Sequence, residues 1–313
     1  MSAGLLRYIA ERVVRAALTV VGVVVLVFLL VRLVPGDPVD AILGDQASPE
    51  DRAALRKSLK LDAPLPVQLE SFVGDVASGT LGHSFRRPDE TVASRIEAVF
   101  PDTVELALAA LLLAWALAVP LDALATVRKG TGWDRAASTV AIAGLAIPNI
   151  WLGPLLILGF AVELRWFPFP GDARAGAAAL VLPAVTLGTA LAAILTRQTR
   201  AAMIEVLDEQ YVLAARARGI GRVRLVVGHA LRNAMLPVMT VGAAQLGALL
   251  SGAVITEKIF ERRGLGTLFL DAFFARDIPV VQGCVLVVAV LYVAVNLGVD
   301  LAYGVIDPRV RLS

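Results

Sequence analysis

The chain has 313 residues, a mean hydropathy of +0.75 and only 18% charged residues. This composition is too apolar for an ordinary soluble domain and indicates a membrane protein. The single cysteine, Cys284, excludes an intramolecular disulfide. Because Cys284 lies inside an apolar segment, we expect it to pack as a small buried hydrophobe.

Several apolar segments reach the length of about 20 residues that a membrane-spanning helix needs. Apolar stretches this long exceed the strand length of a membrane barrel, so the sequence predicts an all-α polytopic membrane protein. In the fourth segment, Pro183 and Gly188 interrupt the apolar run, and Arg197 and Arg200 close it. The six predicted transmembrane helices are 13–34, 103–127, 137–162, 180–204, 235–256 and 281–304.

The first apolar segment is predicted to remain in the protein as a helix. Arg7, Arg12 and Arg15 precede it, as in the basic region of a signal peptide, but the apolar run reaches Val34. That run is longer than a signal core of roughly 7–15 residues, and no A-x-A cleavage site follows it.

The distribution of cations predicts the orientation of the chain. Lys and Arg are more frequent in the segments that lie inside when the amino terminus is inside than in the two short outer loops. By the positive-inside rule, both termini are therefore expected on the cytoplasmic side. The cations between Lys258 and Arg276 count against this orientation.

The segment 35–101, after the first span, is too long to be a simple connection and is predicted to be an outer insertion. Ser48, Pro49 and the acids that follow predict a capped surface helix running to about Leu59. Three glycines within 74–82 then break the chain before it enters the second span.

An Arg-rich polar stretch, 208–237, separates the fourth and fifth apolar segments. Residues 201–217 are rich in helix formers, and Gly219 fits the left-handed residue that ends a helix. A second helical piece follows, so we predict a helix–turn–helix projection between the two spans. Charge alone favours an alternative, an inner loop lying on anionic lipid. The arginines of the stretch are Arg216, Arg218, Arg222, Arg224 and Arg232.

The strings YVLAARARG and HALRNAMLPV in this stretch resemble the EAA loop of ATP-binding-cassette (ABC) importer permeases. The loop resembles the longer form of the EAA loop, which is found in the dipeptide, oligopeptide and nickel permease family. Ala214, Ala215 and Gly219 match its positions, and Pro237 follows eighteen residues after the glycine. Leu213 stands where the general pattern has Glu, as is common in the peptide branch.

Further strings extend the resemblance over nearly the whole chain. VPGDP follows the first span, DIP follows the fifth span at 277–279, and DPR follows the sixth at 307–309. The sequence departs from the family pattern at Arg263, directly before Gly264, where family members often have Pro. The geometry of the turn at this position is therefore left open. The resemblance implies the MetI-like ABC importer permease fold with an outer insertion after the first helix.

The resemblance also implies one transmembrane domain, 1–313, with four parts. These are an amino-terminal helix 1–34, an extracytoplasmic insertion 35–101, a permease core 102–304 and, within the core, a cytoplasmic ATPase-coupling loop 205–234.

Three groups of candidate functional residues follow. For Arg216 and Arg218, which flank the coupling surface, contact with lipid remains the alternative. For the polar residues of the fifth span, the alternative is close helix packing. The predicted coupling residues are Tyr211, Ala214, Ala215, Arg216, Arg218, Gly219 and Pro237; Gln245 and Ser251, polar residues of the fifth span, are predicted to face a translocation path; and Glu257, Gly264, Gly266 and Asp277 are predicted to receive a binding protein.

No catalytic residue and no metal site are expected. The sequence has no G-x-x-x-x-G-K-[ST] phosphate loop, G-x-S-x-G elbow or H-E-x-x-H motif. Of its two histidines, His83 is expected in a solvated loop, and His229 is expected to pack or to form hydrogen bonds. An intramembrane enzyme is therefore disfavoured.

Ionisable residues within the spans are few, and none forms a relay through the bilayer centre. Asp122 and Asp300 lie near the inner ends of the second and sixth spans, and Asp300 is expected to pair with an inner-face arginine. This argues against an autonomous secondary transporter or channel, which remains the main alternative.

The resemblance implies a multi-pass subunit of a bacterial or archaeal cytoplasmic (inner) membrane that holds no cofactor itself. A second permease subunit would complete a heterodimer, two ATP-binding subunits would hold ATP and Mg, and an extracytoplasmic substrate-binding protein would deliver the solute. The chain is also expected to contact membrane lipid. No contact with nucleic acid is expected. The sequence does not choose among dipeptides, oligopeptides, glutathione-like peptides and nickel chelates.

Overall fold

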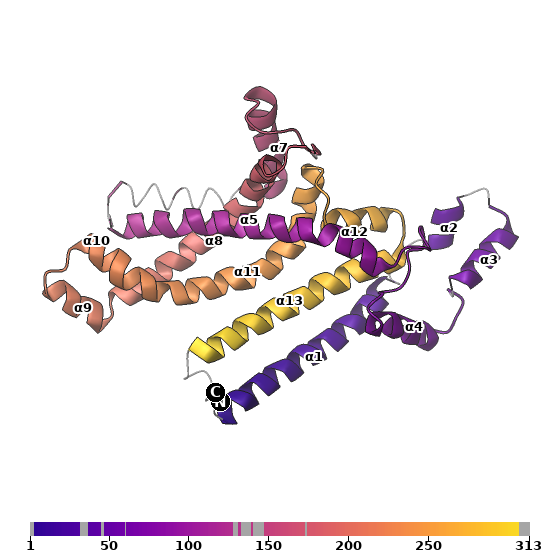
Figure 1. Cartoon of the computed structure of the whole chain (residues 1–313), viewed down its shortest axis with the longest axis horizontal. Coiled ribbons are helices and arrows are strands. Elements are labelled where there is room, and N and C mark those ends of the chain that lie inside the picture. Colours follow the sequence, from indigo (N-terminus) through magenta and orange to yellow (C-terminus); the bar gives the residue numbers. More distant parts are fainter. Residues whose placement is uncertain are drawn as a thin grey trace. The chain divides into compact units, whose positions relative to one another are not determined.

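A computed structural model describes residues 3–31, 37–44, 47–59, 61–127, 131–132, 139, 147–172 and 174–306. Within them the chain is helical and forms no strand beyond a single bridge between His83 and Thr91. An all-α chain is therefore confirmed over this part. The helices (Figure 1) are α1 (Ala3–Val31), α2 (Pro38–Leu43), α3 (Pro49–Ser58), α4 (Leu65–Ala77), α5 (Val92–Val127), α7 (Asn149–Leu156), π-helical η1 (Ile157–Glu163), α8 (Ala178–Leu207), α9 (Gln210–Ala217), α10 (Arg222–Arg224), π-helical η2 (Leu225–Ala230), α11 (Leu231–Ile259), α12 (Leu265–Phe274) and α13 (Ile278–Ile306).

Four helical segments are long and apolar enough to cross a membrane: Arg7–Leu29, Val92–Val127, Ala178–Leu207 and Ile278–Leu301. They coincide with the predicted first, second, fourth and sixth spans. The predicted fifth span lies inside α11, whose 29 residues extend for about 44 Å at 1.5 Å per residue.

The predicted third span is described only in part. Its carboxyl end is the shorter apolar helix Asn149–Glu163, made of α7 and η1. Most of 137–148 lies outside the described residues, as do 32–36 and 307–313, where two of the Pro-bounded helix exits were expected.

The chain divides into two compact units, one formed by Met1–Thr103 with Arg263–Ser313 and the other by Val104–Arg262. The boundary falls inside α5, so this helix contributes to both units. The first unit joins the two ends of the sequence, because α1 and α12 both pack against α13. Figure 1 shows α1 and α13 running side by side.

The core of the first unit gathers side chains from the start of α5, from α12 and from α13. Val92, Leu265 and Val280 are each at most 1% exposed within it. Cys284 is also buried there, which confirms the expected role of a small packing residue.

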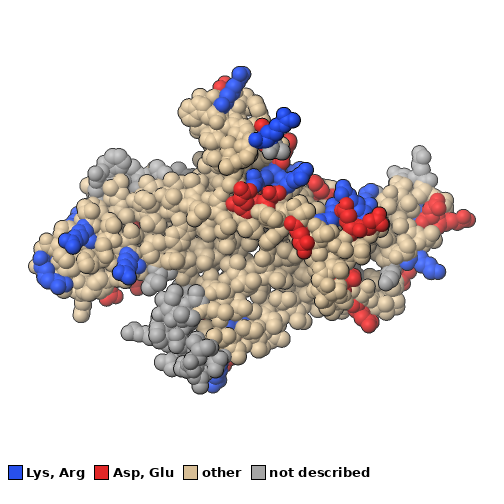
Figure 2. Space-filling model, in the orientation of Figure 1, with Lys and Arg blue, Asp and Glu red and all other residues tan. Residues whose placement is uncertain are grey.

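The insertion after α1 folds into α2, α3 and α4. The predicted cap of α3 is confirmed, since the Ser48 hydroxyl accepts a hydrogen bond of 3.1 Å from the Asp51 amide. Arg52 pairs with Asp40 and Arg56 with Asp37, so α3 is fixed to α2 by charge as well as by chain connection. Figure 2 shows both signs of charge over these helices.

In the second unit, α8 packs along α11 and runs unbroken through Pro183 and Gly188. The interruption seen in the sequence is therefore no break in the helix. A Cβ on Gly188 would lie 2.9 Å from the Ala110 carbonyl oxygen, so the glycine lets α8 approach the α5 backbone. Gly242 of α11 similarly makes room for the ring of Trp115. Small residues in these helices thus serve close packing, as is common between membrane helices.

Replacing Gly188 tests this close approach. Gly188→Ala should destabilise the protein by about 1–3 kcal/mol, because the added methyl group collides with backbone that has no rotamer to change. Thermal unfolding of the purified protein in detergent measures the effect. The matched control is Gly22→Ala in α1, where a Cβ meets nothing within 4 Å. Equal melting temperatures for the two variants would contradict the packing argument.

Candidate functional site

The predicted projection between the fourth and fifth spans is present, but its first helix is divided. α8 ends at Leu207, and α9 begins at Gln210 after an extended Glu209 with φ −68° and ψ 144°. Asp208 and Glu209 end the run of helix formers because Asp favours helix termini over helix interiors. The projection is therefore α9 followed by a turn, α10 and η2, with a hinge-like break before it.

Gly219 ends α9 in a Schellman motif, which confirms the predicted left-handed residue. Its φ is +81°. The Gly219 amide donates to the Arg216 carbonyl at 3.0 Å, and the Ile220 amide donates to the Ala215 carbonyl at 3.3 Å. These two bonds satisfy carbonyl groups that a helix end leaves open, and they reverse the chain.

A small apolar cluster holds α9 against η2. Val212 and Ala215 of α9 and Leu225 of η2 are buried in it, and Ile220 packs against them. Ala215 therefore faces the interior of the projection, whereas Ala214 and Ala217 are exposed. Of the small residues near the bend, only the exposed ones leave room for a partner surface.

Polar contacts fix the projection to the helices beside it. The Asn233 side-chain amide of α11 donates to the Tyr211 hydroxyl at 2.5 Å. Arg216 and Arg218 are exposed. Figure 2 shows mostly basic residues on the surface around α9 and α10, at the left of the view. Pro237 is separate from these residues, because it lies inside α11.

A further link, which the sequence did not reveal, connects the projection to the end of α5. Asp122 is 1% exposed and lies 3.9 Å from Arg200 of α8. The Thr126 hydroxyl donates to Asp122 at 3.4 Å, and Arg222 of α10 donates to the Thr126 carbonyl at 3.4 Å. The sequence showed only that Asp122 is an acid near the end of an apolar span, which indicates a special role but does not identify its partners.

The second acid near a span end, Asp300, pairs with Arg12 at 2.8 Å, which confirms the predicted pairing with an arginine; that this arginine lies on the inner face stays a prediction. The Tyr8 hydroxyl also donates to the Asp300 carbonyl at 3.0 Å. These contacts join α1 to α13 within the first unit.

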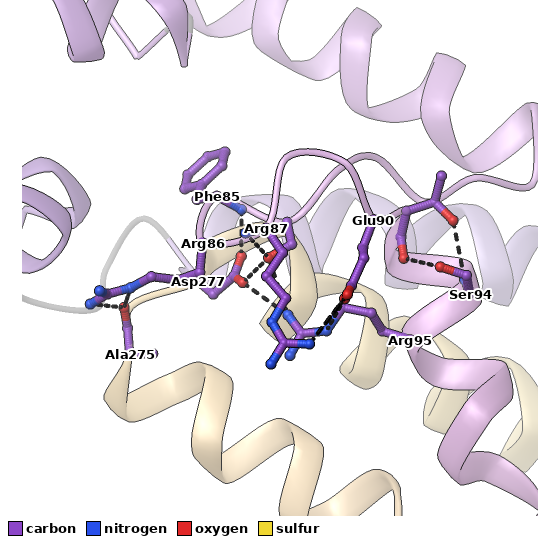
Figure 3. Close-up of polar contacts among 10 residues, drawn as sticks. Phe85, Arg86, Arg87, Glu90, Ser94, Arg95, Ala275 and Asp277 are labelled. Atoms are coloured by element: carbon purple, nitrogen blue, oxygen red, sulfur yellow. Dashed lines mark hydrogen bonds and ion pairs between the residues drawn. The ribbon is translucent and has the colours of Figure 1, made fainter.

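Asp277, a predicted binding-protein residue, is the centre of a buried polar network in the first unit (Figure 3). Its carboxylate accepts hydrogen bonds from the Ser84 hydroxyl at 2.5 Å and from the Phe85 amide at 2.9 Å. Arg95 of α5 adds an ion pair at 3.2 Å. Beside the Asp277 carboxylate, the Arg86 guanidinium donates a hydrogen bond of 3.1 Å to the Ala275 carbonyl. The network fastens the insertion 35–101 to the loop between α12 and α13.

The local backbone explains why Asp277 reaches these partners. Arg276 takes a left-handed φ of +54° at the end of α12. Its amide bonds to the Phe273 carbonyl at 3.2 Å, and the Asp277 amide bonds to the Ala272 carbonyl at 2.9 Å. This is again a Schellman motif, here with a non-glycine residue in the strained position, so the surrounding contacts must offset the strain.

The other predicted binding-protein residues are also buried. The Glu257 side chain is 0% exposed, and Gly264 and Gly266 are buried at the start of α12. The Leu265 amide there is capped by the Thr103 hydroxyl at 2.7 Å. Docking by the side chains of Glu257 and Asp277 would need them to leave these positions, so the role predicted for the group stays untested. The exposed charged residues nearby are Lys258, Glu261 and Arg263.

Gln245 and Ser251 were predicted to face a translocation path, and this role stays a prediction. Gln245 is half-buried on α11, and the Ser251 side chain lies outside the described residues. His83 is exposed, as expected, with its Nδ1 3.0 Å from the Pro88 carbonyl. No group of three or more metal-ligating side chains occurs in the described part of the chain.

Comparison with known proteins places this arrangement in a family. Residues 110–312 match the model of the binding-protein-dependent transport system inner membrane component, and residues 5–107 match that of its amino-terminal part. The chain belongs to this family, and its fold is the MetI-like fold of ABC importer permeases. It is thus a multi-pass inner-membrane permease subunit that functions with a substrate-binding protein and is not itself the catalyst.

Individual relatives match from end to end. The chain is 40% identical over 334 residues to a di/tripeptide transport system permease protein of Pseudomonas aeruginosa, covering 98% of this chain and 99% of the relative. It is 38% identical over 339 residues to a dipeptide transport system permease protein of Escherichia coli K12, with the same coverage. A glutathione transport system permease protein of Escherichia coli O6:H1 is 38% identical over 310 residues, again with 98% and 99% covered.

Substitution of Asp277 tests its structural role. Asp277→Ala removes an acceptor shared by an amide, a hydroxyl and a guanidinium, and it should cost about 2–4 kcal/mol of stability. Asp277→Asn keeps an acceptor oxygen and should cost less. Melting temperatures in detergent rank the variants, with Glu97→Ala, an exposed carboxylate on α5, as the control. A melting temperature for Asp277→Ala that equals the control's would overturn the assignment.

Proposed function

We propose that this chain is one permease subunit of an ATP-driven importer of di- or oligopeptides. Two curated relatives that match it end to end are named for di- or tripeptide transport. The observation that carries the coupling role is the projection of α9, which is capped at Gly219 and held by its own apolar cluster. The relative named for glutathione transport supports a glutathione-like peptide as the second candidate solute, and nickel stays within the range of the family.

The proposed assembly has four other components. A second permease subunit completes a heterodimer around the path, and two ATP-binding subunits, which hold ATP and Mg, dock on loop 205–234. A substrate-binding protein docks on the opposite side, against the insertion 35–101 and the loop around 257–279. Both termini then face the cytoplasm, and no cofactor is held by this chain. The excess of Lys and Arg in the segments on that side supports this orientation.

The proposed mechanism is alternating access driven through α9. The contacts of the projection allow a pull by the ATPase to reach three helices at once. α9 contacts α11 through the Tyr211–Asn233 hydrogen bond and η2 through the apolar cluster, and α10 contacts α5 through the bond from Arg222 to Thr126. A packed cluster transmits displacement because its side chains have no free volume to absorb it. α9 would therefore act as a lever on the second unit.

An autonomous secondary transporter fits the charge distribution less well. Asp122, the buried acid of the α5 span, lies near the end of its helix and pairs with Arg200. Asp300, near the end of α13, pairs with Arg12. A proton- or sodium-driven carrier needs ionisable groups along the path itself. The paired positions instead favour acids that fix helices in place.

Reconstitution in liposomes tests the proposed function. The chain should import a labelled dipeptide only when the second permease, the ATP-binding subunits, the binding protein and ATP are all present. Omitting any one component should abolish uptake, and unlabelled dipeptide should compete more strongly than glutathione or a nickel chelate. Uptake by this chain alone would contradict the proposal in favour of an autonomous carrier.

Gly219 provides the sharpest test of the coupling role. Gly219→Val places a β-branched residue at φ +81°, where an L-residue costs roughly 1–2 kcal/mol, so the transport-to-ATPase ratio should fall roughly tenfold. Gly219→Asn is the matched control, because Asn tolerates this conformation and a Cβ meets nothing within 4 Å there. Peptide uptake and phosphate release are measured in the same proteoliposomes. Equal ratios for both variants would exclude this cap from coupling.

A further inference from the structure

A cavity of about 500 Å³ lies between the projection and the helices behind it. It is formed at the carboxyl-terminal ends of α5 and α8, with α9, α10 and η2 closing the other sides, all within the second unit. Its volume falls within the range of small-molecule sites, about 300–1,000 Å³. The residues that line it are Thr126, Arg200, Ile204, Leu207, Asp208, Arg216, Ile220, Arg222, Leu225 and Val226.

The cavity is positively charged. Three arginines from three different helices line it: Arg200 of α8, Arg216 of α9 and Arg222 of α10. One acid, Asp208, lines it with them, and a second, Asp122, pairs with Arg200. Three cations against two acids leave a net positive charge, so an anion is the ligand that the site favours electrostatically.

The rest of the lining is apolar. Ile204 and Leu207 of α8 face the cavity together with Ile220 of the turn and Leu225 of η2. A free inorganic anion would gain nothing from this surface, and an acidic protein segment would leave much of it uncovered. A ligand that joins a phosphate group to hydrocarbon satisfies both parts of the lining.

The position of the cavity suits a lipid. α5 and α8 are both long and apolar enough to cross the membrane, and both end beside the cavity, at Val127 and Leu207. The predicted spans 103–127 and 180–204 end at or next to the lining residues Thr126 and Ile204, so within this proposal the cavity is placed where the hydrocarbon region gives way to headgroups. Basic pockets between membrane helices at this depth bind acidic lipid headgroups.

We propose that this cavity binds an acidic phospholipid, with the headgroup phosphate between Arg216 and Arg222 and the upper acyl chains against Ile204. The bound lipid would fill the space beneath α9 and stiffen its contact with α5 and α8. The proposal relies on the cytoplasmic side assigned to loop 205–234 under the proposed function and on the predicted spans 103–127 and 180–204 ending at the membrane surface. It does not depend on ATPase docking or on the identity of the solute.

The test uses the complete complex, delipidated in detergent, with fluorescently labelled phosphatidylglycerol as the probe. Saturable binding should be displaced by unlabelled phosphatidylglycerol and not by phosphatidylcholine. Arg216→Gln/Arg222→Gln should weaken binding at least about tenfold, since two charged hydrogen-bond donors are lost. The matched control, Arg224→Gln/Arg232→Gln, removes the same charge from exposed positions that do not line the cavity, and its affinity should stay within about twofold of wild type.

Each of the following results would overturn the proposal. These are no saturable binding to the wild-type complex, equal displacement by phosphatidylcholine, equal weakening in both double variants, and displacement by glycerol 3-phosphate or inorganic phosphate at the concentration that suffices for the lipid. The last would assign the cavity to a free anion. Probe that binds the permease pair but leaves when the ATP-binding subunits are added would assign it to an acidic segment of those subunits. Because no transport is measured, these results are independent of the dipeptide uptake experiment.

Discussion

Buried charge next to an apolar helix must be paired, because the membrane supplies no water to solvate it. The acids near the ends of the long helices follow this constraint. Four of the acids on or beside these helices have an arginine partner on another helix or in the turn that ends one, so that each of these pairs joins two segments of the chain. The helices are thus positioned by apolar contacts along their length and by ion pairs at their ends. The pairs are Arg12–Asp300, Arg95–Asp277, Arg200–Asp122 and Arg262–Glu105.

The projection of α9 shows how a surface element can be both exposed and rigid. Its exposed side carries Ala214 and Arg218, while its inward side is closed by Val212 and Ala215. The Schellman motif at Gly219 fixes the reversal of the chain through two backbone hydrogen bonds within the turn. Such an element can receive a force on one side and deliver it on the other, which is what the proposed coupling to the ATP-binding subunits requires of it.

Local features of the fold could be predicted from the sequence. The Ser48 cap of α3, the left-handed Gly219 and the apolar helices depend on neighbouring residues, whose preferences are visible in sequence. Features decided by distant contacts could not. Arg12 and Asp300 are 288 residues apart, and Ser84 and Asp277 are 193 apart, so the sequence marked the acids without naming their partners. Gly188 was taken as an interruption because the helix it accommodates is remote in sequence.

The buried network at Asp277 has a consequence for biosynthesis. The carboxylate is made about 180 residues after Arg95, and all of the second unit lies between them in the chain. At roughly 5–20 residues per second, synthesis takes on the order of ten seconds or more to supply it. During that interval the insertion 35–101 and α1 are already present without α12 and α13 to pack against. The first unit is therefore the last to be completed, and its folding must wait for the final helix to enter the membrane.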